Sequence, residues 1–314
     1  MKLFRYFAAI FLLFLFSNKI FSQTTNAYDF LRLDLNPRAA AVAGSYVANS
    51  DDPNVIFYNP AGINMLENLP VSFSYVSQWA DISLAGLSLS KNIENVGHFG
   101  LGIDYINYGT MSRRDEMNND LGSFHASEVA FMLAYGNNLD ENFFYGATVK
   151  YIYSGIESAS SAGIGFDLGL QYVIPSQKLN IGFSVLNMGT QVKKYFTTKE
   201  DLPLDVRLGI SKKMERIPLT LYFSFNKLNE DKTNFLDRLN AFTFGGEVNL
   251  SKGLRLRIGY DNEKRQDFKI GGTAGLAGFN IGVGAVIKSY NFDYSYSSFG
   301  LAGAINRIGI TTSF

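Results

Sequence analysis

The chain has 314 residues, of which 28 are basic, 28 acidic, two are histidine and none is cysteine. The absence of cysteine excludes disulfides, thiolate metal sites, a cysteine nucleophile and a lipid anchor on an N-terminal cysteine, and zero net charge argues against a nucleic-acid partner. Charged residues make up 18% of the chain, below the roughly 25% of a typical soluble domain, whereas aromatic residues reach 15%. This composition favours one large β-structure in unusual surroundings.

Residues 1–22 are predicted to be a signal peptide for export. Lys2 and Arg5 precede a continuous apolar run at residues 7–16, and the small Ser22 follows. A basic start, an apolar core and a small residue at the cleavage site are the pattern of a secretory signal. The alternative, a membrane-anchoring helix, is weaker because the run has about half the roughly 20 residues that a span needs.

Residues 23–70 do not alternate and are predicted to form a plug or hatch. Pro37 suits the first turn of a helix, and the small residues that follow predict a short helix over 38–50. Small side chains allow a segment to pack closely against strands. We therefore expect this segment to sit at the periplasmic mouth of the fold described next.

The second part of this segment contains two acidic residues and two proline breaks. Asp51 and Asp52 are predicted to cap a helix or form a turn, because two adjacent carboxylates do not make an EF-hand pattern. Pro53 and Pro60 interrupt the chain. The sequence therefore predicts an ordered loop or a pair of short helices.

From residue 71 to residue 314 the chain alternates between apolar and polar positions, which is the signal of β-strands. In residues 254–260, for example, leucine, isoleucine and tyrosine alternate with arginine and glycine. Fourteen such segments of about ten residues fit the length of a tilted membrane-spanning strand. They are 71–79, 82–91, 97–108, 124–136, 142–154, 163–173, 179–188, 203–212, 217–228, 240–251, 253–261, 277–287, 289–298 and 304–314.

The connections alternate in length as well. The joins after even-numbered segments are short, whereas most joins after odd-numbered segments are longer and polar, at 109–123, 155–162, 189–202, 229–239 and 262–276. Short periplasmic turns and longer outer loops are the pattern of outer-membrane barrels.

The predicted fold is an all-β, 14-stranded antiparallel transmembrane barrel with a short N-terminal helical plug, in the outer membrane of a Gram-negative bacterium. A soluble β-sandwich is the alternative, but it would carry charge on its outer face, whereas the polar faces here are rich in glycine. The apolar faces carry bulky side chains that suit outer-membrane lipid. The last strand alternates up to Phe314 and looks like the recognition signal of the outer-membrane assembly machinery.

The polar face of the strands would line the lumen, and its charges are predicted to form a paired network because an unpaired charge in a narrow interior is costly. Inward glycines leave room for the N-terminal segment. The inward charged residues are Asp104, Glu128, Lys150, Asp167, Asp205, Arg207, Glu247, Arg255, Arg257, Asp293 and Arg307.

The sequence contains no motif of a familiar enzyme or cofactor site. P-loop, dinucleotide-binding, nucleophile-elbow and zinc-protease patterns are absent. His98 and His125 fall near opposite strand ends, so a joint metal site is not expected. We predict no catalytic residue, no cofactor and no metal.

Residues 37–62, PRAAAVAGSYVANSDDPNVIFYNPAG, resemble the N-terminal signature of FadL-type barrels and, closely, that of the PorV/PorQ family. Asn59, Pro60, Ala61 and Gly62 match the hatch motif of these proteins. Downstream, LNMGTQV, LPLDVRLGISKK, LAGFNIGVG and FDYSYSSFGLAGAINRIGITT are similar to PorQ in particular. The likeness covers essentially the whole mature chain.

The resemblance implies an outer-membrane component of the type IX secretion system of the Bacteroidota. It implies a non-enzymatic scaffold or carrier whose outer loops contact PorZ-like, PorU-like or PorV-like proteins, and which also contacts C-terminal domains of cargo. Two alternatives remain. A FadL-like transporter of hydrophobic small molecules would need an apolar pocket, a lateral opening in the wall and a movable hatch, and a phospholipase-type enzyme would need a Ser–His pair on the outer wall. The inward charges disfavour an apolar pocket.

Overall fold

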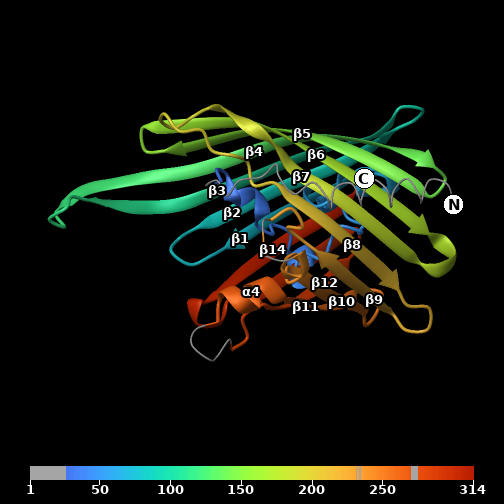
Figure 1. The fold of residues 1–314 in the computed structure, drawn as a ribbon. Helices are drawn as coiled ribbons and strands as arrows, with labels where there is room; N and C mark the ends of the chain where they lie inside the picture. The colour runs from blue at the N-terminus through green and yellow to red at the C-terminus, as the bar shows by residue number, and fades with distance from the viewer. Residues whose placement is uncertain (1–25, 231, 233–234, 270–274) are drawn as a thin grey trace.

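The computed structural model describes residues 26–230, 232, 235–269 and 275–314, so the predicted signal peptide at 1–22 lies outside the described residues. The described chain forms a closed barrel of fourteen antiparallel strands (Figure 1). Consecutive strands are neighbours, and β14 pairs with β1 to close the wall. The predicted fold class is therefore confirmed, and this large barrel is that of an outer-membrane protein.

The strand bounds follow the alternating segments closely. They are β1 (Pro70–Ser77), β2 (Ser83–Ile93), β3 (Gly97–Arg114), β4 (Asp120–Asp140), β5 (Phe143–Ile156), β6 (Ala159–Ile174), β7 (Leu179–Lys193), β8 (Asp205–Lys213), β9 (Leu219–Phe225), β10 (Phe242–Asn249), β11 (Leu254–Asp261), β12 (Phe279–Ile287), β13 (Tyr290–Ser298) and β14 (Ala304–Ser313).

Two predicted outer loops are wrong. Most of 109–123 and 155–162 is strand, because the β3–β4 and β5–β6 ladders continue beyond the apolar alternation. A hairpin ladder is held by backbone hydrogen bonds, and these do not require one face to be apolar. Figure 1 shows the β3–β4 hairpin projecting far beyond the rest of the barrel.

The ends of the barrel are assigned from its connections. The turns that follow the even-numbered strands are short, so the end of the barrel that carries these turns faces the periplasm. The opposite, extracellular end carries the longer connections, which include α3 (Phe235–Arg238), α4 (Asn262–Asp267) and η5 (Gly300–Ala302), whereas η4 (Pro175–Gln177) lies in a periplasmic turn. Among the described residues, no helix is long and apolar enough to cross a membrane.

The outward face of the wall is apolar, as the alternation predicts. On β11, Leu254, Leu256 and Ile258 are exposed, whereas Arg257 is buried. Aromatic side chains contact one another along both rims, for example Tyr135 with Tyr145 near the periplasmic end and Tyr260 with Phe279 near the extracellular end. Two aromatic rows that flank an apolar band are typical of outer-membrane barrels.

The N-terminal segment folds inside the barrel as η1 (Asp29–Arg32), α2 (Pro37–Ala41), η2 (Pro53–Phe57) and η3 (Pro60–Met65). We call residues 26–69 the plug. The predicted helix over 38–50 is wrong in length: α2 has five residues. It ends there because Ala43 and Gly44 take the left-handed backbone conformation, with φ of 57° and 69°, and turn the chain.

Inward glycines accommodate the plug at close range. A Cβ atom at Gly245 would lie 2.5 Å from Cβ of Val42, and one at Gly282 would lie 2.5 Å from Cβ of Ala41. The backbone of Pro60 similarly occupies the space in front of Gly146. Only hydrogen at these wall positions leaves room for the plug backbone.

The C-terminus completes the seam of the barrel. Phe314 exchanges two backbone hydrogen bonds with Leu69, at 3.1 and 3.2 Å, and its side chain is exposed. Its predicted role as an assembly signal concerns biogenesis and stays a prediction.

Candidate functional site

The extracellular half of the lumen contains an apolar chamber on the side formed by β1–β5 and β14. Inward side chains from six strands form its wall, and Phe299 lies above them near the rim. Phe30 and Leu35 of the plug fill the space between them and are themselves buried. We define the apolar chamber by its inward wall residues Val76, Leu84, Ile106, Met132, Ile152 and Ile305.

Sequence reasoning missed this chamber, although a signal was present. On β1 the inward residues run Ser72, Ser74 and Val76 from the periplasmic to the extracellular end. On β3 the corresponding step leads from Asp104 to Ile106. The inward face of these two strands thus changes from polar to apolar partway along the strand, and averaging over the face hides this change.

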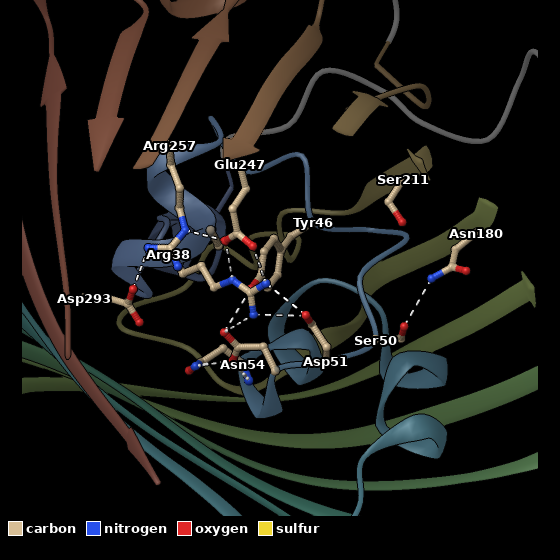
Figure 2. Close-up of polar contacts among 12 residues, drawn as sticks. Arg38, Tyr46, Ser50, Asp51, Asn54, Asn180, Ser211, Glu247, Arg257 and Asp293 are labelled. Carbon is tan, nitrogen blue, oxygen red and sulfur yellow. Dashed lines mark hydrogen bonds and ion pairs between the residues drawn. The ribbon is translucent and has the colours of Figure 1, made fainter. Parts of the chain in front are cut away.

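The periplasmic half of the lumen is charged, and one arginine of the plug anchors it. Nε and Nη2 of Arg38 donate to Glu247 on β10 at 2.9 and 3.1 Å, and Nη1 and Nη2 donate to Asp51 at 3.0 Å each (Figure 2). Arg257 on β11 donates to Glu247 and to Asp293 on β13, both at 2.5 Å. These five residues form the anchoring network. Its barrel members were predicted as inward charges, but the central Arg38 was not.

A second set of contacts joins the plug to β1 and β2. Asp52 caps η2 by accepting from the backbone N–H of Asn54 at 2.8 Å, and it accepts from the hydroxyl of Tyr46 at 2.9 Å. Nδ2 of Asn54 donates to Ser72 at 2.8 Å, and Ser88 donates to Oδ1 of Asn54 at 3.0 Å. Asp52 thus occupies a helix cap and lies 3.8 Å from Nη1 of Arg38, whereas Asp51 accepts two hydrogen bonds from Arg38.

The hatch motif fixes the plug to the opposite wall. Asn59 is fully buried and caps η3, where its Oδ1 accepts from the N–H of Ala61 at 3.1 Å. Its Nδ2 donates to the carbonyls of Val47 at 2.7 Å and of Leu170 on β6 at 3.1 Å. Pro60 begins η3, and a Cβ at Gly62 would lie 2.6 Å from the carbonyl oxygen of Asn49.

A bulge interrupts the wall between β6 and β7. Phe166 is opposite Met188 but Leu168 is opposite Val185, so β7 holds one extra residue. Asn187 there has φ of 61°.

Three polar side chains on the inner face close this bulge, and we call them the bulge cluster. The N–H of Asn187 donates to Asp167 at 2.8 Å, and Nζ of Lys150 lies 2.6 Å from Oδ1 of Asn187 and 2.9 Å from Oδ2 of Asp167. Lys150 and Asp167 were predicted as inward charges. The alternation of apolar and polar residues in the sequence does not indicate the bulge.

On the extracellular side of this bulge, the wall between β7 and β8 is not a continuous ladder of hydrogen bonds. Their pairing stops at Leu186 and Asp205, and residues 202–204 close the remaining space. We call these residues the wall segment. Leu202 packs into the apolar chamber, whereas Leu204 packs against an apolar cluster on the outward face.

Three side chains hold the backbone of the wall segment. Nδ2 of Asn187 donates to the carbonyl of Pro203 at 3.2 Å. Arg32 of the plug and Asn229 donate to the carbonyl of Leu204 at 2.8 and 3.0 Å. The plug thus contacts the point where the wall is incomplete.

The remaining predicted inward charges are spread over the lumen. Asp205 pairs with Arg207 at 2.7 Å, Glu128 accepts from the hydroxyl of Tyr108 at 2.6 Å, and Arg307 donates to the carbonyl of Asp34 at 2.7 Å. Asp104 is buried and Arg255 is half-buried near the periplasmic end. The charges therefore form several local groups rather than one network.

A lysine on the extracellular side links the plug to α4. Nζ of Lys264 lies 3.0 Å from Asp261 and 3.5 Å from Asp34 of the plug. Burial lowers the pKa of Lys264, but the carboxylates of Asp261 and Asp34 more than offset this effect and hold it above its usual value.

No described part of the chain gathers three or more side chains suited to holding a metal ion. His98 and His125 lie toward opposite ends of the β3–β4 hairpin. What the lumen offers chemically is an apolar volume above a charged, hydrogen-bonded floor.

No protein-family model and no curated protein matches the sequence. Solved structures do match the fold. The toluene transporter TbuX of Ralstonia pickettii superposes with a TM-score of 0.61 at 14% identity, over 92% of this chain and all of that one. A FadL homologue of Pseudomonas aeruginosa gives 0.57 at 12% identity over 89% and 98%, and the toluene transporter TodX of Pseudomonas putida gives 0.56 at 12% over 92% and 99%.

These identities show likeness of fold alone. The comparisons give no support to the narrower resemblance to the PorV/PorQ family. The chain is an outer-membrane barrel with the fold of the FadL-type proteins.

Proposed function

We propose that this protein admits hydrophobic small molecules across the outer membrane. The observation that carries the proposal is the apolar chamber, whose volume is filled by Phe30 and Leu35 of the chain's own plug. Apolar contacts are non-directional, so a hydrophobic ligand can take the place of the Phe30 and Leu35 side chains. The fold shared with two toluene transporters supports the same reading.

The wall segment supplies a lateral route out of the chamber. Leu202 faces the chamber and Leu204 faces the outward apolar cluster of Phe183, Val185, Val206 and Leu228. A hydrophobic molecule is more stable in the bilayer than in the aqueous periplasm. Displacement of the wall segment would therefore release such a molecule into the membrane. The contact of Arg32 with Leu204 couples this displacement to the plug.

The test is uptake by cells that express the full chain, with radiolabelled toluene as the probe. Phe30→Ala should raise the initial rate several-fold because it vacates the chamber. Leu33→Ala is the matched control, since Leu33 lies in the same segment but is exposed. Equal rates in cells with and without the protein would refute the proposal.

The second candidate function is a scaffold or carrier of type IX secretion, and the projecting β3–β4 hairpin supports it. β2 pairs with β3 only up to Asn107, and β5 pairs with β4 only from Ala126 onward. The end of the hairpin is thus a two-stranded ribbon with free edges. Met117 and Leu121 near its tip are 85% and 56% exposed.

A free edge and exposed apolar side chains suit contact with another protein. The expected partners are PorZ-like, PorU-like or PorV-like surface proteins, or C-terminal domains of cargo. The test is a mild-detergent pull-down of the tagged protein, with mass spectrometry, beside a variant in which residues 113–120 are replaced by a short Gly–Ser turn. Recovery of such a protein by the full chain, and its loss from the variant, would favour this function over transport.

A further inference from the structure

Asp104 lies where the two halves of the lumen meet. It is an inward residue of β3, and the next inward residue toward the extracellular side is Ile106 of the apolar chamber. Its partners on the neighbouring strands are Gly86 on β2 and Ala130 on β4. Because both neighbours are small, the plug approaches the wall closely beside this carboxylate: a Cβ atom at Gly86 would lie 3.0 Å from Cδ1 of Leu35.

The Asp104 carboxyl group has unused hydrogen-bonding capacity. The residue is 3% exposed, and among the described residues its Oδ1 atom accepts no hydrogen bond. Buried polar atoms without partners are uncommon in native proteins and require an explanation. The nearby cations have other partners, since Lys150 pairs with Asp167 and Arg207 with Asp205.

Asp104 faces a small cavity of about 10 Å³. Leu31 and Leu35 of the plug, Met132 of the apolar chamber and the cations Lys150 and Arg207 line it as well. This volume admits about one water molecule. Displacement of Leu31 and Leu35 with the plug would join the cavity to the apolar chamber, and Asp104 would then form part of the chamber floor.

We propose that Asp104 determines specificity by accepting a hydrogen bond from a hydroxyl or amino group on an otherwise hydrophobic ligand. The inference rests on the proposed function and names the substrate class as hydroxyl- or amino-substituted aromatic molecules. A carboxyl group accepts hydrogen bonds whether or not it is ionised. A ligand that carries a carboxylate is disfavoured, because its charge would lose hydration in the apolar chamber and it has no proton to donate to Asp104.

The experiment measures binding of naphthalene, 1-naphthol and 1-naphthoate to the purified full chain in detergent, by their fluorescence. The wild type should bind naphthol roughly tenfold more tightly than naphthalene, a difference of about 1.4 kcal/mol, and naphthoate most weakly. Asp104→Leu should bring the naphthol-to-naphthalene ratio close to one while naphthalene binding persists. Asp104→Asn keeps an acceptor oxygen, so it should retain the preference for naphthol and bind naphthoate more tightly than the wild type does.

Asp140→Leu is the control, because Asp140 is an exposed acid at the periplasmic end of β4. Folding of each variant is checked by the heat-dependent shift of the barrel on gels. If Asp104→Leu does not fold, the inference is tested by whether Asp104→Asn binds naphthoate more tightly than the wild type does. Naphthalene binding with no change of ligand preference in either Asp104 variant would overturn this inference and leave the proposed function standing. A wild type that binds none of the probes would overturn the proposed function, and the inference with it.

Discussion

The two halves of the lumen hold the plug in different ways and largely through different strands. In the periplasmic half, Arg38 and Asn59 bind the plug to the wall through directional hydrogen bonds. In the extracellular half, Phe30 and Leu35 contact the wall through apolar side chains, although Arg32 and Asp34 beside them also make polar contacts. Directional bonds specify one arrangement, whereas apolar contacts accept any occupant of similar shape. We therefore expect the periplasmic half to stay fixed and the extracellular half to exchange its contents.

Arg38→Ala should have the largest effect on this difference, because it removes the centre of the anchoring network. Breaking a buried ion pair costs about 3–5 kcal/mol, and we expect a value near the lower end because Glu247 keeps Arg257 as a partner. The readout is the urea concentration at the midpoint of barrel unfolding. Arg114→Ala, on the exposed β3–β4 hairpin, serves as control. Matching midpoints for the two variants would mean that the network does not hold the plug.

Asn59→Ala should have the next largest effect. The change deprives the carbonyls of Val47 and Leu170 of a donor and removes the cap of η3. A lost buried partner costs about 1–3 kcal/mol, so the heat-modifiable band should convert at a lower temperature. Asn92→Ala, at an exposed position of β2, should leave that temperature unchanged. A stable Asn59→Ala barrel would contradict a structural role for the hatch motif.

Gly245→Ala should have a smaller effect, because the plug can shift slightly to relieve it. The new methyl group would lie 2.5 Å from Cβ of Val42, and overpacking of this kind costs about 1–3 kcal/mol. The neighbouring Gly246→Ala is the matched control, since its methyl group would meet nothing closer than 3.6 Å. A difference between the two variants in the hydrogen-exchange protection of the plug backbone would show that the plug depends on this close approach. Identical exchange would show that the plug does not depend on this close approach.

Much of the barrel could be predicted from the sequence, because the side chain of each wall residue points either to the lipid or to the lumen. Lipid accepts Leu256 or Ile258, and the interior accepts Arg257, so period-2 alternation marks strands and faces together. The β3–β4 hairpin was not predicted in full. Its outer part is surrounded by water on both faces, and backbone pairing there leaves no apolar alternation to detect.

The candidate site was harder to predict, because its partners lie far apart in the chain and alternation reports only on the local strand. The sequence marked Glu247 as inward, but its partner Arg38 lies more than 200 positions away along the chain. Local alternation contains no information about such a pair. The inward charges also disfavoured an apolar pocket, whereas the structure has apolar inward residues toward the extracellular ends of β1–β5 and β14.

The sequence by itself determined the closed, lipid-facing barrel, since the alternation of Leu254 to Tyr260 and its counterparts reflects a solvent boundary that each strand meets locally. Only the tertiary structure decided where the plug packs, where Asn187 interrupts the wall and that Oδ1 of Asp104 is buried without a partner within the described chain. These features depend on distances between segments that are far apart in the chain, and such distances arise only when the barrel closes around its own N-terminal segment.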